Sequence, residues 1–242
     1  MPRPVRRSVG GVIYHVLNRA HGRRRLFRAE GDYVAFLTTL AEALRRFPGV
    51  RLLAYCVMPN HFHLVVWPTR DGELSAFVRW LTQTHVQRWH SAKNAVGDGA
   101  LYQGRFKSFA VQDDHHLLVL CRYVERNALR AKLSRRAEAW RWGSAWTRES
   151  SHRSDSLRAA LADWPIERPS DWVALLNTVQ SDADESAVRA SIARGRPLGD
   201  KAWLERTARR LGLAQTLRGA GRPKGARDRR RRRRPQTSGA TD

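Results

Sequence analysis

The chain has 242 residues, 42% of them hydrophobic and 28% charged, which is typical of one folded domain of ordinary size with an appendage. Its two cysteines, Cys56 and Cys121, exclude a disulfide framework and a cysteine zinc site, and no apolar run approaches the ~18 residues of a membrane span. The formal net charge of +23 predicts a polyanionic partner, with nucleic acid first, although a GC-rich genome would also enrich arginine.

The first half of the chain alternates short strand and helix patterns. β-branched and aromatic residues predict a strand at 12–17, and a helix follows at about 31–44. Two strands at 52–58 and 61–67 join through a tight turn at Pro59-Asn60, and a second helix covers 73–90. A short strand at 105–112 comes before a third helix, which we expect from His115 to about Arg136.

This order predicts an α+β fold of the ferredoxin-like type. The pattern β-α-β-β-α-β gives an antiparallel sheet with two helices on one face, and the third helix can cover the other face. We expect this domain to occupy residues 1–150. A small helical appendage follows at 151–217, with helical pieces at 172–179, 185–193 and 201–211, and a basic tail at 218–242 lacks the apolar residues needed to fold when free.

The segment "MPNHFHLVVW" carries two histidines one residue apart. Residues i and i+2 of a strand point to one face, so His61 and His63 project together, with Cα atoms roughly 6.5–7 Å apart. Two imidazoles at this spacing can bind one metal ion, but they can also be two half-exposed side chains that a strand tolerates. The spacing alone therefore leaves both interpretations open.

The third predicted helix carries a second polar set. Tyr123, Asn127 and Arg130 stand at i, i+4 and i+7 and share one helix face. They offer a phenol nucleophile, an oxygen ligand and a fork that binds phosphate. Taken alone, Tyr123 can also be a boundary tyrosine with its hydroxyl group in water.

Together these segments resemble a known family. The stretches "VIYHVLNRA", "AYCVMPNHFHLVVWP", "LYQGRFKSFAV" and "CRYVERNALRAKL" are similar to those of the HUH-type single-tyrosine transposases, and most closely to the REP-associated tyrosine transposases of bacteria. The resemblance covers the first ~150 positions. It implies a catalytic tyrosine at Tyr123 and metal ligands at His61, His63 and Asn127. The family usually has proline after this asparagine, where the chain has Ala128, so we expect the helix to continue.

The resemblance also implies an activity. The expected protein is a metal-dependent endonuclease and strand transferase that cuts and rejoins single-stranded or hairpin DNA of the REP type through a 5′-phosphotyrosine intermediate. Mg²⁺ or Mn²⁺ is the expected cofactor, and the ligand types favour Mn²⁺. We expect a monomer, with a dimer as the alternative, located in the cytoplasm with the nucleoid and not in a membrane.

Cations beside aromatic residues mark the expected DNA-binding surface. Candidates are Arg105 and Lys107 with Tyr102 and Phe106, the segment "WRWGSAW" at 140–146, and two arginines of the third helix, Arg122 and Arg130. In the tail, Arg222 and Lys224 belong to "GRPKG", which resembles a hook for the minor groove and precedes an arginine run. The tryptophans could instead be core residues, and the tail a nonspecific charge run.

Two other function classes remain open at this stage. The first is a catalytically silent DNA-binding protein that represses its own repeats, against which the complete set of His61, His63, Tyr123 and Asn127 argues. The second is a zinc hydrolase built on the histidine pair, which lacks an obvious third histidine or carboxylate ligand and leaves the charge unexplained.

Overall fold

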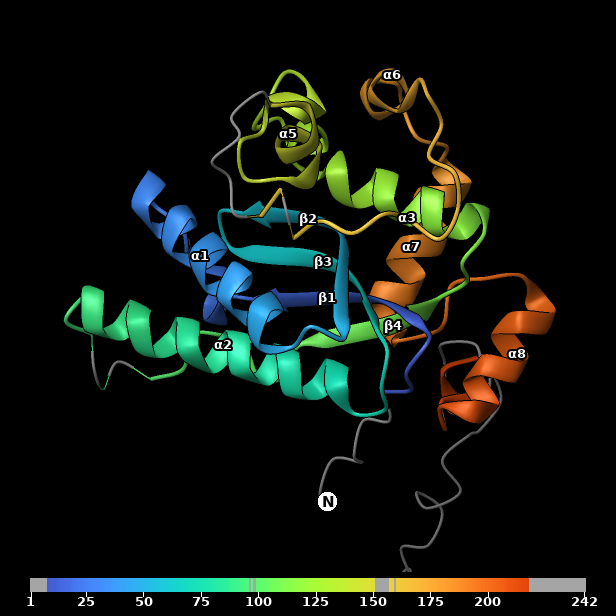
Figure 1. Cartoon of the computed structure of the whole chain (residues 1–242), viewed down its shortest axis with the longest axis horizontal. Helices are drawn as coiled ribbons and strands as arrows, with labels where there is room; N and C mark the ends of the chain where they lie inside the picture. Colours follow the sequence, from blue (N-terminus) through green and yellow to red (C-terminus); the bar gives the residue numbers. More distant parts are fainter. Residues whose placement is uncertain (1–7, 96, 98, 151–156, 159, 218–242) are drawn as a thin grey trace, which may run out of the picture.

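The computed structural model describes residues 8–95, 97, 99–150, 157–158 and 160–217 (Figure 1). A four-stranded sheet lies at its centre, in the order β2-β3-β1-β4, and every neighbouring pair of strands is antiparallel. The strands are β1 (Ile13–Arg19), β2 (Val50–Met58), β3 (His61–Pro68) and β4 (Lys107–Val111). The predicted α+β class with an antiparallel sheet is confirmed.

Helices surround this sheet on both faces. The α-helices are α1 (Glu30–Arg46), α2 (Glu73–Ala92), α3 (His115–Glu125), α4 (Asn127–Arg130), α5 (Ser144–Glu149), α6 (Trp172–Asn177), α7 (Asp182–Arg194) and α8 (Lys201–Arg210). Short 3-10 turns are η1 (His21–Arg23), η2 (Ala137–Ala139) and η3 (Ala214–Leu217). In Figure 1, α1 and α2 run side by side across one face, and α3 lies on the other side of the sheet.

Strand alternation divides the interior into two cores. On β1, Tyr14 and Val16 face the core under α1 and α2, whereas Ile13 faces the core under α3. On β3, Phe62, Leu64 and Val66 point to the first core and Val65 points to the second. The odd-numbered residues of β3, which include both histidines, therefore lie on the α3 face.

The third helix is shorter than expected. It ends at Glu125, and α4 follows after one residue and ends at Arg130. Lys132 has a φ of 57°, and the Leu133 amide donates to the carbonyl of Ala128, which is how a left-handed residue closes the end of a helix. The prediction of a helix to about Arg136 was wrong because this backbone closure stops it without a glycine or proline signal.

The three predicted C-terminal helices are present as α6, α7 and α8, and they pack directly on the sheet domain. Trp172, Leu176 and Val188 belong to the same core as the apolar side of α3. The carboxylate of Glu125 is buried and accepts hydrogen bonds from Ser144 and from the indole of Trp172 at 2.7 Å. These contacts tie α3 to α5 and α6 through one side chain.

The same C-terminal region covers both edges of the sheet. Leu161 forms a parallel bridge with Leu52 on the β2 edge, and Leu198 does so with Val111 on the β4 edge. Gly143 adds an antiparallel bridge with Cys56. At these positions the segments take up edge hydrogen-bonding groups that would otherwise be open to another chain. The basic tail, with Arg222 and Lys224, lies outside the described residues.

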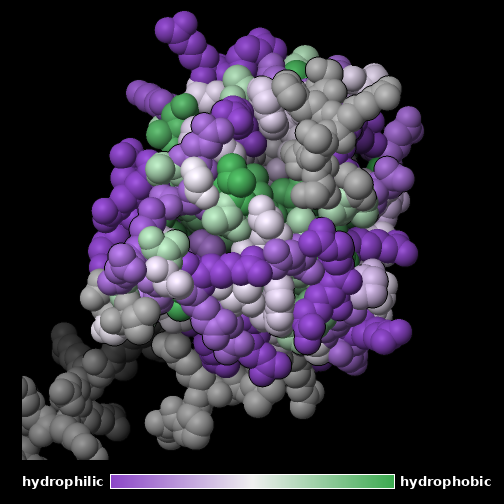
Figure 2. All heavy atoms as spheres, turned by 60° about the vertical axis from the view of Figure 1, so that its left-hand side comes forward, coloured by the Kyte–Doolittle hydropathy of each residue, from purple (hydrophilic) through white to green (hydrophobic). Residues whose placement is uncertain are grey.

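The visible surface is mostly polar. Figure 2 shows a face covered largely by hydrophilic side chains, with hydrophobic ones gathered near its centre. Among the described residues, no helix combines the length and the apolar character that crossing a membrane requires. Cys56 and Cys121 are free and buried, as the composition suggested.

Candidate metal and tyrosine site

The two histidines of β3 lie at the end of the sheet where the β2–β3 turn begins. Their ring centroids are 4.9 Å apart and the rings are nearly perpendicular, at 73°. His61 is half-buried, whereas His63 is buried between His15 of β1 and Tyr123 of α3. The i, i+2 spacing thus brings two imidazoles to one point on the α3 face.

Each of these imidazoles has one nitrogen already in a hydrogen bond. His61 Nδ1 lies 2.6 Å from Oδ1 of Asn60, and His63 Nδ1 lies 2.7 Å from Nε2 of His15. An amide oxygen is only an acceptor, so Asn60 fixes the proton of His61 on Nδ1. The Nε2 lone pair of His61 is then free to bind a metal ion, and a proton on Nδ1 of His63 gives that ring the same arrangement.

Burial keeps the three histidines neutral. Burial, together with the guanidinium groups of Arg19 and Arg130, which contribute less, lowers the pKa of His61 to about 3. Burial also lowers the pKa of His15 to about 3 and that of His63 well below its usual value. A metal ligand must be a neutral imidazole, so these rings need lose no proton near neutral pH.

Tyr123, Asn127 and Arg130 come together despite the break between α3 and α4. The Arg130 guanidinium carbon stands 3.9 Å from the centre of the Tyr123 ring, and the same group donates a hydrogen bond of 3.0 Å to Oδ1 of Asn127. The Tyr123 ring lies 6.2 Å from that of His63. One arginine therefore contacts both the tyrosine and the asparagine, beside the histidine pair.

The donor set fits a divalent ion. Asn127 is buried, and its Oδ1 atom, which accepts one hydrogen bond from Arg130, keeps a second lone pair that can face an ion. Its Nδ2 atom has no hydrogen-bond partner among the described residues, but an N–H group is a donor and cannot bind a cation. Two neutral imidazole nitrogens and one amide oxygen suit a borderline ion such as Mn²⁺ and also admit Mg²⁺. His61, His63 and Asn127 are thus the residues that could hold the ion.

A carboxylate from the C-terminal region stands behind this arginine. Glu185, in the first turn of α7, lies 3.8 Å from Arg130 and 3.9 Å from Arg126, and it pairs with Arg189 at 2.6 Å. Its side chain is only 14% exposed, so water weakens these pairs less than it would at the surface. The region expected to be an appendage therefore contributes to the surroundings of the site.

A cleft opens beside the histidines toward β4. It has a volume of about 510 Å³, and its lining includes Arg19, Arg105 and Lys107, with Ile192 of α7 on one side. Arg19 pairs across the sheet with His61, so the cleft adjoins the candidate ligands. Two of the sequence-predicted cations, Arg105 and Lys107, thus lie together beside the site.

Two other residues predicted to contact DNA, Arg122 and Tyr102, have side chains that are engaged within the protein. The Arg122 side chain donates to the carbonyl oxygens of Leu175, Thr178 and Val179 and fastens α3 to the end of α6. Tyr102 is buried, and its hydroxyl group is 2.8 Å from Nδ1 of His85, so the structure favours a packing role for this ring over stacking on DNA.

The tryptophans after α4 pack within the protein. Trp142 stacks on Tyr33 with ring centroids 4.7 Å apart, and Trp140 donates its indole N–H to Val57 of β2. The structure therefore favours the core interpretation for these two rings over stacking on DNA.

A second histidine cluster lies at the start of α3. Within the described part of the chain, Asp114, His115 and His116 are the one group of three histidine, cysteine or acidic side chains close enough to share an ion. Oδ1 of Asp114 already caps the helix through the amide of His116. The site at His61 and His63 is not a cluster of this kind, because its third proposed ligand is the amide of Asn127 and not a histidine, cysteine or acidic side chain.

Sequence reasoning missed His15 and Glu185. His15 sits in "VIYHVLNRA", and only the pairing of β1 with β3 shows that it reaches His63. A histidine at a buried position of a central strand was the available signal. Glu185 had none, because it lies 55 residues after Arg130 in a helix with no motif.

The chain was compared with family models, with curated protein sequences and with solved structures. Residues 8–127 match the family model described as "Transposase IS200 like", a range that contains all four candidate residues up to Asn127. No curated protein sequence matches the chain.

Solved structures that match the chain include a REP-associated tyrosine transposase bound to a REP hairpin, at 18% identity and a TM-score of 0.49, covering 69% of this chain and 92% of that one. Another is a candidate transposase from Deinococcus radiodurans R1, at 23% identity and a TM-score of 0.37, covering 51% of this chain and 96% of that one.

Proposed function

The chain belongs, through residues 8–127, to the IS200-like transposase family, and on that premise we propose that it cuts and rejoins one DNA strand with Tyr123 as the nucleophile. The observation that carries this proposal is the convergence of Tyr123, Arg130 and Asn127 on the histidine pair of β3. A phenol beside a cation and a set of metal donors is an arrangement suited to phosphodiester cleavage.

The reaction needs one covalent step in each direction. The Tyr123 oxygen attacks phosphorus, the bond from phosphorus to the 3′ oxygen breaks, and the departing 3′ hydroxyl group takes up a proton. The product is a 5′-phosphotyrosine, which keeps a phosphoester bond in the protein. A second 3′ hydroxyl group can attack it, release the tyrosine and rejoin a strand without ATP.

Arg130 has two roles in this proposal. Its guanidinium carbon stands 3.9 Å from the centre of the Tyr123 ring, and this cation–π contact holds the tyrosine in place. Its hydrogen bond to Asn127 holds the amide next to the tyrosine. A divalent ion bound by His61, His63 and Asn127 would supply charge stabilisation for the scissile phosphate.

Single-stranded or hairpin DNA is the proposed substrate. The cleft of Arg19, Arg105 and Lys107 gives a strand three cations beside the histidine pair, and Phe106 in its lining offers an apolar ring for a base. A tyrosine held against the sheet, with its side chain only 6% exposed, reaches a backbone phosphate more readily in an unpaired strand than in a duplex. REP-like hairpins are the specific substrate that the sequence resemblance implies.

A labelled hairpin tests the proposal. The full-length protein is incubated with a hairpin carrying a single-stranded extension, labelled on the 3′ side of the expected cut, with Mg²⁺ or Mn²⁺ and in parallel with EDTA. After boiling in detergent, label should migrate with the protein only in the metal-containing samples. Tight hairpin binding without any protein-linked label would instead support the catalytically silent DNA-binding protein.

A further inference from the structure

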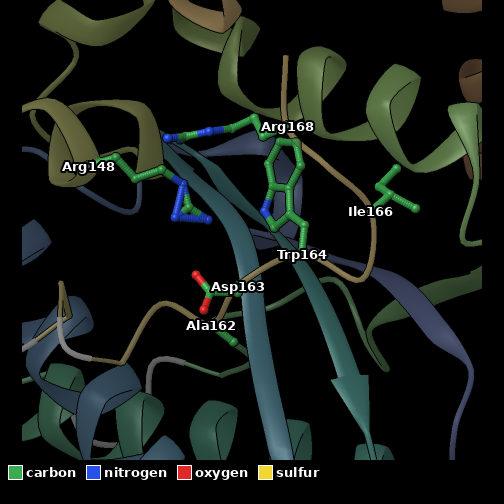
Figure 3. A pocket seen from close by; sticks show the side chains of 6 residues that line it. All are labelled: Arg148, Ala162, Asp163, Trp164, Ile166 and Arg168. Carbon is green, nitrogen blue, oxygen red and sulfur yellow. The ribbon is translucent and has the colours of Figure 1, made fainter. Parts of the chain in front are cut away.

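A second cation-lined pocket lies at the β2 edge of the sheet, away from the histidines. Its volume is about 220 Å³, and it is lined by Arg148, Ala162, Asp163, Trp164, Ile166 and Arg168 (Figure 3). Leu53 of β2 stands beside it, whereas the histidine pair adjoins Met58. Five residues of strand separate these two positions by roughly 16 Å, so the pocket and the metal site are different places.

A bulge in β2 creates the wall of this pocket. The pairing with β3 shifts register between Leu52 and Ala54, which leaves Leu53 out of the ladder. The Leu53 carbonyl accepts hydrogen bonds from the indole of Trp164, at 2.8 Å, and from the guanidinium group of Arg148. The bulge therefore fixes one arginine and one aromatic ring side by side at the edge of the sheet.

Both arginines line this pocket, and Arg148 has a buried hydrogen-bond donor without a partner among the described residues. Figure 3 shows the guanidinium groups of Arg148 and Arg168 on the same side of the pocket, with the Trp164 ring across from them. Nε of Arg148 is buried and has no partner within the described residues, and no ion pair is formed there by Arg148, Arg168 or Asp163. A buried guanidinium nitrogen without an acceptor is costly, so an anion would fill a real deficit.

The electrostatics agree with this deficit. Burial lowers the pKa of Arg148; the Glu125 carboxylate counteracts this, and Arg168 lowers the pKa further. Both carboxylate oxygens of Glu125 already accept hydrogen bonds, one from Ser144 and one from Trp172, inside the protein. Asp163 contributes a negative charge to the pocket, which leaves an excess of one cation among the lining residues.

We infer that this pocket is a second anion site, which binds a phosphate group between Arg148 and Arg168 with the Trp164 ring beside it. Guanidinium groups bind phosphate oxygens through paired, charge-assisted hydrogen bonds. The volume is below the ~300–1,000 Å³ of sites for drug-sized ligands, which suits one phosphate and its ester group. The phosphate can belong to a DNA backbone or to a small phosphate compound, and the DNA case rests on the proposed function.

Inorganic phosphate tests the chemistry of the pocket without DNA. The Nε–H signal of Arg148 is followed by NMR in the full-length protein, after assignment by its loss in Arg148→Lys. Phosphate should shift this signal saturably, at concentrations where chloride of equal ionic strength does not. Because Arg168 is exposed, Arg168→Gln should fold normally and weaken the phosphate affinity about tenfold, as expected for one charge-assisted hydrogen bond.

A salt series identifies the source of the phosphate. Binding of a hairpin with a single-stranded extension is measured for the wild type, for Arg168→Gln and for Arg45→Gln, an exposed arginine of α1 with the same change in charge. A DNA phosphate in the pocket predicts that Arg168→Gln flattens the slope of log K against log salt by about 0.7–0.9, and Arg45→Gln by less.

The outcomes separate cleanly. A saturable shift with phosphate together with a flattened slope supports a DNA phosphate in the pocket. A saturable shift without a slope change supports a small phosphate compound. If phosphate leaves the Arg148 signal where chloride leaves it, the inference is wrong, whatever the chain does to DNA. Failure to cleave hairpins would count against Tyr123 chemistry and leave the phosphate result standing.

Discussion

The sheet domain at 8–130 and the C-terminal region at 157–217 contribute to the candidate site in different ways. The first supplies the proposed metal donors and the proposed nucleophile. These stand in short motifs, His61 and His63 on β3 and Tyr123 with Asn127 on consecutive helices. The second supplies Glu185 beside Arg130 and covers both edges of the sheet. The difference teaches that residues of short motifs bring the candidate groups together, while contacts with residues far away in the sequence hold them in position.

The largest expected loss follows from a change in the sheet domain. His61→Ala should reduce metal-dependent cleavage by about a thousandfold or more, because charge stabilisation by a bound ion contributes several kcal/mol. His61 is half-buried, so the fold should survive. The measurement is cleavage at saturating hairpin and metal, with His116→Ala, another half-buried histidine, as the control.

Equal losses in His61→Ala and His116→Ala would remove the distinction between the two histidine clusters.

His63→Ala should abolish cleavage as well, but the structure buries His63, so this variant should also unfold at a lower temperature. The strand pattern alone does not show this cost, because it places His63 on one face of the sheet without showing what covers that face.

The hydrogen bond that His63 donates to His15 should have the next largest effect. His15→Phe keeps an aromatic ring beside Phe109 but leaves Nδ1 of His63 without its partner. Partners of metal ligands typically contribute 10–100-fold to affinity or activity, so we expect the Mn²⁺ affinity to fall by about that factor. Titration of the metal against cleavage measures it. His15→Gln, which can still accept this hydrogen bond, should recover part of the loss, and no recovery would argue against the proposed tautomer.

Glu185 tests whether the C-terminal region acts on the site at all. Glu185→Gln removes the charge that holds Arg130, and we expect cleavage at saturating DNA to fall about two- to fivefold, in line with a partly buried ion pair. Asp182→Asn, in the same first turn of α7 but exposed, is the matched control. If both variants behave like the wild type, the C-terminal region only covers the sheet and does not act on the site through Glu185.

The tail should have no effect on the chemistry itself. Nine cations and one acid lie between Arg222 and Arg234. If about half of them engage phosphates, truncation after Gly221 should flatten the slope of log K against log salt by about 3. Discrimination between cognate and scrambled hairpins, and cleavage at saturation, should hardly change because backbone contacts carry no base code. A loss of discrimination would show that "GRPKG" reads sequence.

Much of the sheet domain follows from the sequence, because strand alternation and helix stripes are local signals. These local signals alone predict the order of the first six elements and the position of His61 and His63 on one face of a strand. The break after Glu125 and the end of α4 at Arg130 could not be predicted, since no glycine or proline marks them and a left-handed lysine at 132 closes the second helix. Neither could the roles of His15 and Glu185, which depend on strand register and on the packing of α7. The chemistry at Tyr123 came from family resemblance, not from spacing.

The central claim is that Tyr123 carries the DNA strand during the reaction. Protein incubated with the extended hairpin and Mn²⁺ is digested, and the peptide bearing a nucleotide is identified by mass spectrometry. We expect the nucleotide on Tyr123, and we expect Tyr123→Phe to form no adduct while binding the hairpin within a few-fold of the wild type. An adduct on another tyrosine, or an adduct that persists in Tyr123→Phe, would contradict the account.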